Sequence, residues 1–255
     1  MISKQNQSNI GNFLFRYRGE IPVLLLVIGL VVRYNHYAAG NLYDSTYDYA
    51  CLGISLVGFC FRIHAVGYSP RGTSGRNTGQ QMATNLNMTG LYSIVRHPLY
   101  LANFVIWLPI AMLSYSSLFC IAFLLFFMMF YTYIISVEEE FLSKKFGLLY
   151  DEWKNETPAF IPNFTLYSKS YMAFNWKKVL RKEKNGLAAI FTTYFLFQVA
   201  HALGSHQSVI IFINENVFWI IMFVLSVVNY LVMKLLMLKS LWVYASNKDQ
   251  KSEIK

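Results

Sequence analysis

Charged side chains border two apolar segments in the middle of the chain. Arg96 and His97 directly precede Pro98, which opens one apolar run, and Glu138 and Glu139 close the next. Pro98 suits the first turn of a helix, where free N–H groups and the helix dipole favour an anion. An arginine adds to such an anion site, whereas carboxylates accept hydroxyl groups or balance a cation. These residue types indicate a site for a polar ligand of mixed charge; a lipid-facing arginine and a solvated acidic helix end are the alternatives.

The apolar segments that must position these residues have the character of membrane helices. The 255-residue chain is 55% hydrophobic and only 14% charged, well below the roughly 25% charge of soluble domains. We predict an all-α fold, a polytopic membrane helical bundle with about six spans. The predicted spans are 20–38, 48–67, 98–116, 117–137, 186–203 and 216–238. The third and fourth meet at a short turn, so they form a helical hairpin that returns both charged pairs to one membrane face.

Lysine and arginine residues indicate the orientation of this bundle. Cytoplasmic loops of membrane proteins accumulate these residues. They occur in the N-terminal segment and in 62–97, 138–185 and 239–255, and only Arg33 falls toward the outside. We therefore expect both termini and the hairpin mouth in the cytoplasm. The same rule explains the net charge of +9, and without a recognition module we expect no nucleic-acid partner.

Two cytoplasmic segments are large enough for chemistry. The segment 68–98 is rich in Gly, Ser, Thr and Asn, and its Arg71, Arg76 and Asn77 can cradle a phosphate with side-chain and backbone donors. An ordinary flexible loop is the alternative. The segment 138–164 begins with the periodicity of an amphipathic helix, which continues the fourth span and ends before two prolines. We predict an interfacial anchor for the basic and aromatic residues that follow.

These features divide the chain into three parts. We predict an N-terminal segment with the first span (1–47), a core of three spans with the cytoplasmic loop and amphipathic helix (48–165), and a basic interfacial segment with two further spans (166–255). No metal site is predicted, because the three cysteines lie in apolar runs at spacings that fit neither zinc nor a disulfide framework.

The two charged motifs, taken together, resemble those of the isoprenylcysteine carboxyl methyltransferase and phospholipid methyltransferase superfamily. That pattern has a Gly-x-Tyr lead-in, RHPxYxG, an apolar span, EExxLxxxFGxxYxxY and a late VPxxxP. Over about residues 50–165, this sequence supplies Gly90, Tyr92, Arg96, His97, Pro98, Tyr100, Glu138, Glu139, Leu142, Phe146, Gly147, Tyr150, Pro158 and Pro162. It departs at Ala102, where the family usually has Gly, and at Trp153, where a second Tyr is common.

The resemblance implies an integral-membrane methyltransferase that uses S-adenosylmethionine and takes its lipid acceptor from the bilayer. The cofactor-binding residues that it implies are Gly90, Tyr92, His97, Pro98, Tyr100, Glu138 and Glu139. We assign catalytic roles to Arg96, which binds the carboxylate of the cofactor or the acceptor, and to Glu139, which binds the cofactor. Arg71, Arg76 and Asn77 are the expected substrate-binding residues.

The sequence leaves the acceptor open. We rank O-methylation of a lipid phosphate first, such as the 1-phosphate of lipid A, because the loop SPRGTSGRNTGQ, which holds Arg71, Arg76 and Asn77, resembles that of bacterial members proposed to act there. This ranking places the protein in the bacterial inner membrane. An isoprenylcysteine carboxylate and a phospholipid amine are the next candidates; only the amine would require a base. A sterol-reductase-like enzyme and a non-catalytic membrane protein are the remaining alternatives.

Overall fold

The computed structural model describes residues 4–70 and 83–253, with side chains described for 10–70 and 83–237. Within these ranges every regular element is helical, apart from one isolated antiparallel bridge between Gly90 and Ser168. The elements are α1 (Lys4–Arg16), α2 (Ile21–Ala38), α3 (Ser45–Tyr68), α4 (Leu91–Ile94), α5 (Pro98–Met112), α6 (Ser117–Phe146), α7 (Leu148–Glu156), the 3-10 turn η1 (Phe164–Leu166), α8 (Trp176–Gly204), α9 (Val209–Glu215) and α10 (Val217–Glu253). The all-α prediction is confirmed.

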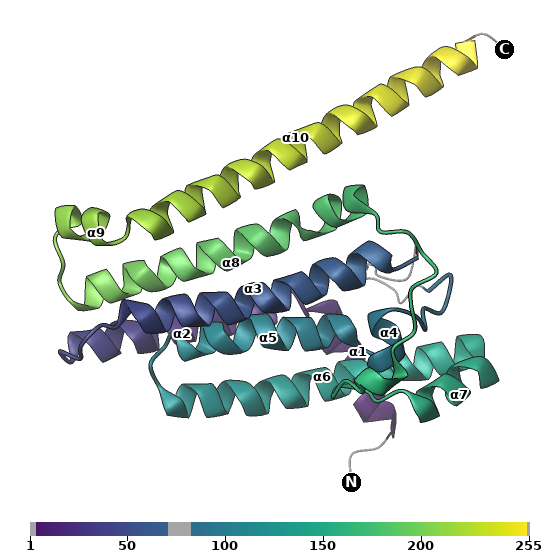
Figure 1. Cartoon of the computed structure of the whole chain (residues 1–255), viewed down its shortest axis with the longest axis horizontal. Helices are drawn as coiled ribbons and strands as arrows, with labels where there is room; N and C mark the ends of the chain where they lie inside the picture. Colours follow the sequence, from purple (N-terminus) through teal and green to yellow (C-terminus); the bar gives the residue numbers. More distant parts are fainter. Residues whose placement is uncertain (1–3, 71–82, 254–255) are drawn as a thin grey trace.

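Long helices lie side by side in the order α10, α8, α3, α5 and α6, as Figure 1 shows. The main core lies where α3 meets α5 and α8, with Phe59, Ile106 and Tyr194 among its buried side chains. Helices α3 and α5 approach closely at Gly58, where a Cβ would lie 2.9 Å from the backbone nitrogen of Ile106. Helices α4 and α7 lie at one end of the bundle and α9 at the other.

Five helices among the described residues are long and apolar enough to cross a membrane: α2, α3, α6, α8 and the first 21 residues of α10. The third predicted span is wrong in length, because α5 has only 15 residues. At 1.5 Å per residue such a helix is about 22 Å long, less than the roughly 30 Å of a bilayer core. It ends near the turn at Ser114, and Pro109 lies inside it. α5 is therefore a short helix held inside the bundle.

Other predicted boundaries also need correction. The fifth predicted span started at residue 186, but α8 starts ten residues earlier at Trp176, so much of the predicted anchor is helical. Helix α10 continues well past residue 238. Helix α1 was not predicted; it packs on α6 through Phe15. The division into three parts stays a prediction, although α8 packs directly on α2 and α3.

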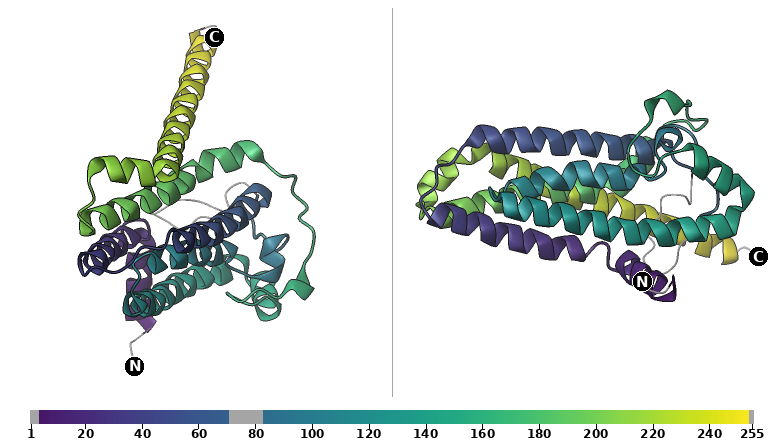
Figure 2. Two further views of the ribbon diagram at one scale, coloured as in Figure 1. Left: turned by 60° about the vertical axis from the view of Figure 1, so that its left-hand side comes forward. Right: turned by 90° about the horizontal axis from the view of Figure 1, so that it is seen from below.

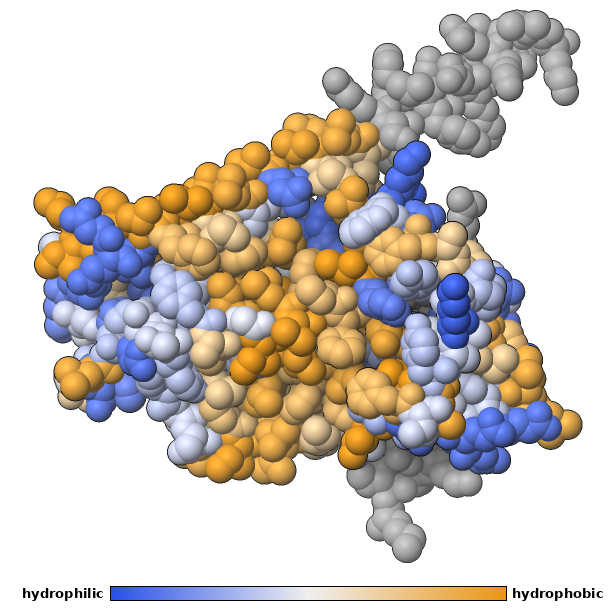
Figure 3. Space-filling model, viewed as in Figure 1, coloured by the Kyte–Doolittle hydropathy of each residue, from blue (hydrophilic) through white to orange (hydrophobic). Residues whose placement is uncertain are grey.

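The outer surface of the bundle is strongly apolar. Figure 3 shows a broad hydrophobic band across the middle of one face, with hydrophilic residues gathered toward the two ends. Large apolar side chains such as Leu24, Leu125 and Leu235 are exposed on three different helices. Helices satisfy their own backbone hydrogen bonds, so such a surface suits contact with lipid. These features are those of an integral membrane protein.

A buried ion pair joins the helices at the α9 end of the bundle. The Arg33 Nη2 atom lies 2.6 Å from Asp48 Oδ2, and both side chains are completely buried. Arg33 also donates to the Leu113 carbonyl oxygen at 2.7 Å, and Gln198 donates to Asp48 at 2.7 Å. The pair connects α2, α3 and α8 with the end of α5. The charge of Arg33 is therefore paired within the protein, although its buried Nε atom has no hydrogen-bond partner among the described residues.

Candidate active site

The hairpin of α5 and α6 brings the two charged motifs together. A tight turn at Ser114 and Tyr115 joins the helices, and the Ser116 hydroxyl caps α6 by accepting from the Phe119 N–H. α6 then returns past the start of α5, so that Arg96 Nε donates to Glu139 Oε1 at 2.9 Å. The predicted convergence of the motifs is confirmed.

Glu139 is the centre of an ion cluster. Its Oε1 atom lies 2.9 Å from Arg96 Nη2 and 3.1 Å from His97 Nε2, and its Oε2 atom lies 2.8 Å from Lys154 Nζ. Counting backbone and side chain together, only 8% of the surface of Glu139 is exposed. A carboxylate with three basic partners is strongly held in its ionised form. Both of its oxygens are thus committed to protein groups.

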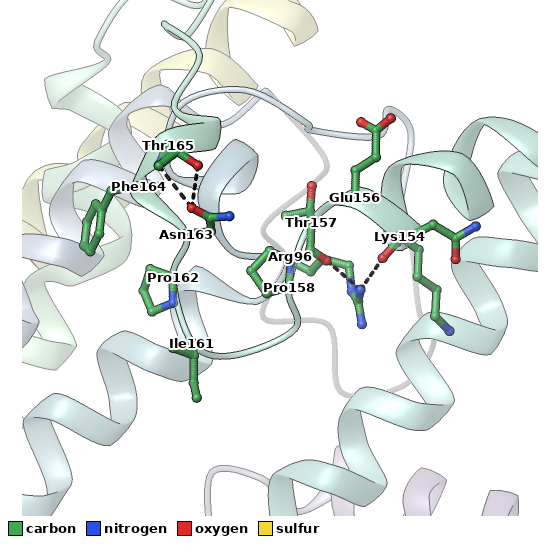
Figure 4. A pocket seen from close by; sticks show the side chains of 11 residues that line it. Arg96, Lys154, Glu156, Thr157, Pro158, Ile161, Pro162, Asn163, Phe164 and Thr165 are labelled. Atoms are coloured by element: carbon green, nitrogen blue, oxygen red, sulfur yellow. Dashed lines mark hydrogen bonds between the residues drawn. The ribbon is translucent and has the colours of Figure 1, made fainter.

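Arg96 fastens the end of α7 to the start of α5. Its Nη1 atom donates to the carbonyl oxygens of Lys154 and Thr157, each at 2.6 Å, and its backbone N–H donates to the Pro158 oxygen at 2.9 Å. The last carbonyls of a helix have no partner within the helix, so a guanidinium satisfies them well. Figure 4 shows the side chain reaching both carbonyl groups at the edge of an open pocket of about 800 Å³. The anion-binding role of Arg96 stays a prediction.

Glu138 is more accessible than its neighbour. The Tyr100 hydroxyl donates to Glu138 Oε2 at 2.7 Å, and the His97 ring stacks on Tyr100 with a centroid distance of 5.5 Å. The Glu138 side chain is 32% exposed, against 10% for Glu139. Burial, with the nearby Glu138 charge, raises the pKa of the Tyr92 phenol. Tyr92 therefore stays a neutral hydroxyl next to this carboxylate.

Gly90 and Pro98 shape the backbone of the site. Gly90 has a φ of +65°, a left-handed conformation that favours glycine, and its N–H donates to the Ser168 oxygen at 2.9 Å. This bond holds the segment after η1 against the start of α4. Pro98 occupies the first turn of α5, as predicted. Both residues position their neighbours through the backbone.

Two buried donors on α7 are without partners among the described residues. They are the Tyr150 hydroxyl and the indole N–H of Trp153, whose rings are 5.7 Å apart. Burial, with the charge of Glu139, raises the pKa of the Tyr150 phenol, so the group remains a donor. Unsatisfied buried donors are costly, and a bound ligand that accepts from them would remove that cost.

One member of the cluster was not predicted from the sequence, and three predicted residues lie where the structure cannot test them. Lys154 was not predicted, since nothing in the sequence of α7 distinguishes it from the other charged residues there. It reaches Glu139 because Gly147, with a φ of +57°, ends α6 and redirects the chain into α7. Arg71, Arg76 and Asn77, the predicted phosphate-binding residues, lie outside the described residues.

Residues 49–148 match the phospholipid methyltransferase family. The chain is also 28% identical over 163 residues to the nickel-cobalt-cadmium resistance protein NccN of Alcaligenes xylosoxydans xylosoxydans, covering 63% of this chain and 71% of that protein. No solved structure shows significant similarity. The matched segment contains both charged motifs and the whole hairpin. The similarity of this chain to the phospholipid methyltransferase family thus lies in the segment that carries the hairpin.

Proposed function

We propose that this protein transfers a methyl group from S-adenosylmethionine to an anionic oxygen of a membrane lipid. The observation that carries the proposal is the convergence of Arg96 and His97 with Glu138 and Glu139 at one end of a bundle with an apolar outer surface. The family match supports methyl transfer over the reductase and non-catalytic alternatives.

The residues at the hairpin mouth fit this cofactor. The partly exposed Glu138 carboxylate has capacity to accept ribose hydroxyls, and the unpartnered donors of Tyr150 and Trp153 suit a carboxylate. The stacked rings of His97 and Tyr100 would line the site beside these groups. S-adenosylmethionine, when bound, supplies a methyl group activated by the adjacent sulfonium. We place Gly90 and Tyr92 at the edge of this site.

The side chains of the site position the reactants and exclude water. An ionised phosphate or carboxylate oxygen needs no general base, so alignment is the main task. In this proposal Glu139 orients the side chains of His97, Arg96 and Lys154 through its ion contacts with all three. Arg96 in turn holds the end of α7, which carries the two unpartnered donors close by. This arrangement gives Arg96 and Glu139 a larger part in forming the site than in contacting a ligand.

A lipid phosphate is the proposed acceptor, with the 1-phosphate of lipid A as the specific candidate. The basic, glycine-rich composition around Arg71, Arg76 and Asn77 supports this choice. A lipid of this kind would place the protein in a bacterial inner membrane with the site on the cytoplasmic side. An isoprenylcysteine carboxylate would fit the same chemistry, whereas a phospholipid amine is an alternative outside it, because an amine must first lose a proton to a base.

The experiment is methylation by the purified protein in phosphatidylcholine nanodiscs with labelled S-adenosylmethionine. Lipid A, N-acetyl-farnesylcysteine and phosphatidylethanolamine are offered as separate acceptors. We expect label in a phosphate methyl ester of lipid A. Label in a carboxyl ester or an amine would select one of the other acceptors, and failure of the protein to bind S-adenosylmethionine would overturn the proposal.

A further inference from the structure

A second ion pair lies between α3 and α8, near the candidate site. Arg62 Nε lies 2.8 Å from Glu183 Oε2, and Arg62 Nη2 donates to Glu183 Oε1 at 3.2 Å. Arg62 Nη1 also donates to the Asn103 side-chain oxygen on α5. Three helices thus hold one guanidinium in a fixed orientation. Glu183 lies outside residues 49–148, the part of the chain that matches the family.

Polar side chains connect this pair to the proposed cofactor site. The Asn103 amide donates to the Tyr131 hydroxyl at 3.0 Å, and the Tyr131 ring lies 4.8 Å from the ring of Tyr100. Tyr100 then donates to Glu138. The path runs from α8 through α3 and α5 to the acidic end of α6. A ligand bound at Arg62 would therefore be a neighbour of one bound at Glu138.

The Arg62 pair is open, unlike the pair at the opposite end of the bundle. Arg33 and Asp48 are completely buried, whereas the Arg62 side chain keeps 20% of its surface although Glu183 keeps only 4%. An arginine has five N–H donors, and three of those of Arg62 are engaged with Glu183 and Asn103. Two donors remain for a further acceptor.

Several polar side chains near Arg62 are likewise partly exposed. Tyr92, Tyr100, Asn103 and Tyr131 are only partly buried. The Tyr92 hydroxyl has no hydrogen-bond partner among the described residues and is close enough to Arg62 and Glu138 to feel both charges. Ionisable residues inside a membrane bundle are costly, and they commonly mark functional sites.

We propose that Arg62, oriented by Glu183 and Asn103, binds the anionic headgroup of the acceptor lipid beside the cofactor site. The inference rests on the proposed function and adds the place where the acceptor is recognised. A guanidinium with two free N–H groups suits two oxygens of one phosphate. Glu183 gives α8 a role in that recognition, so the C-terminal part of the chain completes a site that the family segment begins.

The test measures cross-linking of a photoreactive phosphatidic acid to the full chain in phosphatidylcholine nanodiscs. The double variant Arg62→Gln and Glu183→Gln removes both charges and leaves no unpaired buried ion. We expect cross-linking to fall at least about tenfold, as for the loss of a charge-assisted hydrogen bond. Affinity for S-adenosylmethionine, measured by calorimetry, should stay within about twofold of wild type.

The matched control is Arg33→Gln with Asp48→Asn, the same neutralisation at the closed pair. This variant should cross-link phosphatidic acid as wild type does. Cross-linking that survives in the Arg62 variant, or falls equally in the control, overturns the assignment. Loss of cofactor binding in the folded Arg62 variant would place Arg62 in the cofactor site instead. No cofactor binding by the wild type would overturn the proposed function separately.

A second variant and a competition experiment complete the test. If the double variant does not fold, Arg62→Lys decides, because lysine keeps the charge but loses the planar pair of donors. We expect severalfold weaker cross-linking, and unchanged cross-linking would overturn the proposal. Excess glycerol 3-phosphate should leave wild-type cross-linking unchanged; protection by it would identify a soluble anion and overturn the lipid assignment.

Discussion

Glu138 and Glu139 should respond oppositely to the same substitution. In Glu139→Gln the negative charge at the centre of the ion cluster is lost, while Arg96, with a side chain only 11% exposed, keeps its positive charge. Removing one partner of a buried ion pair costs about 3–5 kcal/mol. Lys154 adds little to this figure, because its side chain is 40% exposed and solvent can replace the carboxylate. We therefore expect Glu139→Gln to lower the free energy of unfolding by about 3–5 kcal/mol.

Glu138→Gln should have the reverse profile. The glutamine oxygen can still accept from Tyr100, and the side chain is 32% exposed, so the stability should change by less than about 1 kcal/mol. The charge that would accept ribose hydroxyls is lost, however. Hydrogen bonds to charged groups are worth about 1.5–3 kcal/mol, so affinity for S-adenosylmethionine should fall about 10- to 100-fold.

The assay pairs urea unfolding of the detergent-solubilised protein with calorimetric titration of S-adenosylmethionine. Both variants are measured against wild type under one set of conditions. The reasoning is refuted if Glu139→Gln unfolds like wild type and loses cofactor affinity, while Glu138→Gln binds the cofactor normally. That result would make Glu139 the ligand-binding carboxylate and Glu138 a solvated helix end.

Three more predictions concern packing, topology and pH. Gly58→Ala should lower the free energy of unfolding by about 1–3 kcal/mol, because the added Cβ would meet the α5 backbone. In the control Gly53→Ala, on the same helix, the added Cβ meets nothing within 4 Å, so this change should be neutral or stabilising. Equal stability of the two variants would contradict the packing. Reporter fusions at Ser116 and at the C-terminus should lie on opposite sides of the membrane, and a shared side would refute the predicted topology. Burial raises the pKa of Tyr92, so the unfolded chain loses the phenol proton at a lower pH than the folded protein does, and the stability that the neutral phenol contributes is complete below about pH 10 and falls as the pH rises further. Tyr92→Phe should therefore lose less stability than wild type between about pH 10 and 11. Parallel losses of stability in the two proteins would contradict this.

The sequence was informative where local chemistry determines the fold. Pro98 marked the start of α5, and the short turn before Ser117 required an antiparallel hairpin. An antiparallel hairpin returns the end of its second helix toward the start of its first, so the sequence predicted that Arg96 and Glu139 lie near one another, although α6 with 30 residues is twice as long as α5 with 15. The long apolar runs likewise predicted the fold class, because segments of that length and composition form membrane-spanning helices.

Contacts between distant helices were beyond this reasoning. The pairing of Arg62 with Glu183 depends on the packing of α8 against α3, which no periodicity in either segment encodes. Glu183 was also assigned to an interfacial segment, because the charged residues at the start of α8 masked its helical character. Lys154 was missed because its position depends on the backbone at Gly147. A pattern of residue types therefore could not predict the Arg62–Glu183 pair or the contact of Lys154 with Glu139.

The central claim is that this protein methylates a membrane lipid, and its most direct test is mass spectrometry of cellular lipids. Total lipids, including lipid A, are extracted from cells with and without the protein after growth on methyl-labelled methionine. We expect one lipid to carry a labelled methyl ester on its phosphate only when the protein is present. If no lipid gains the label in a protein-dependent way, lipid methylation by this chain is contradicted.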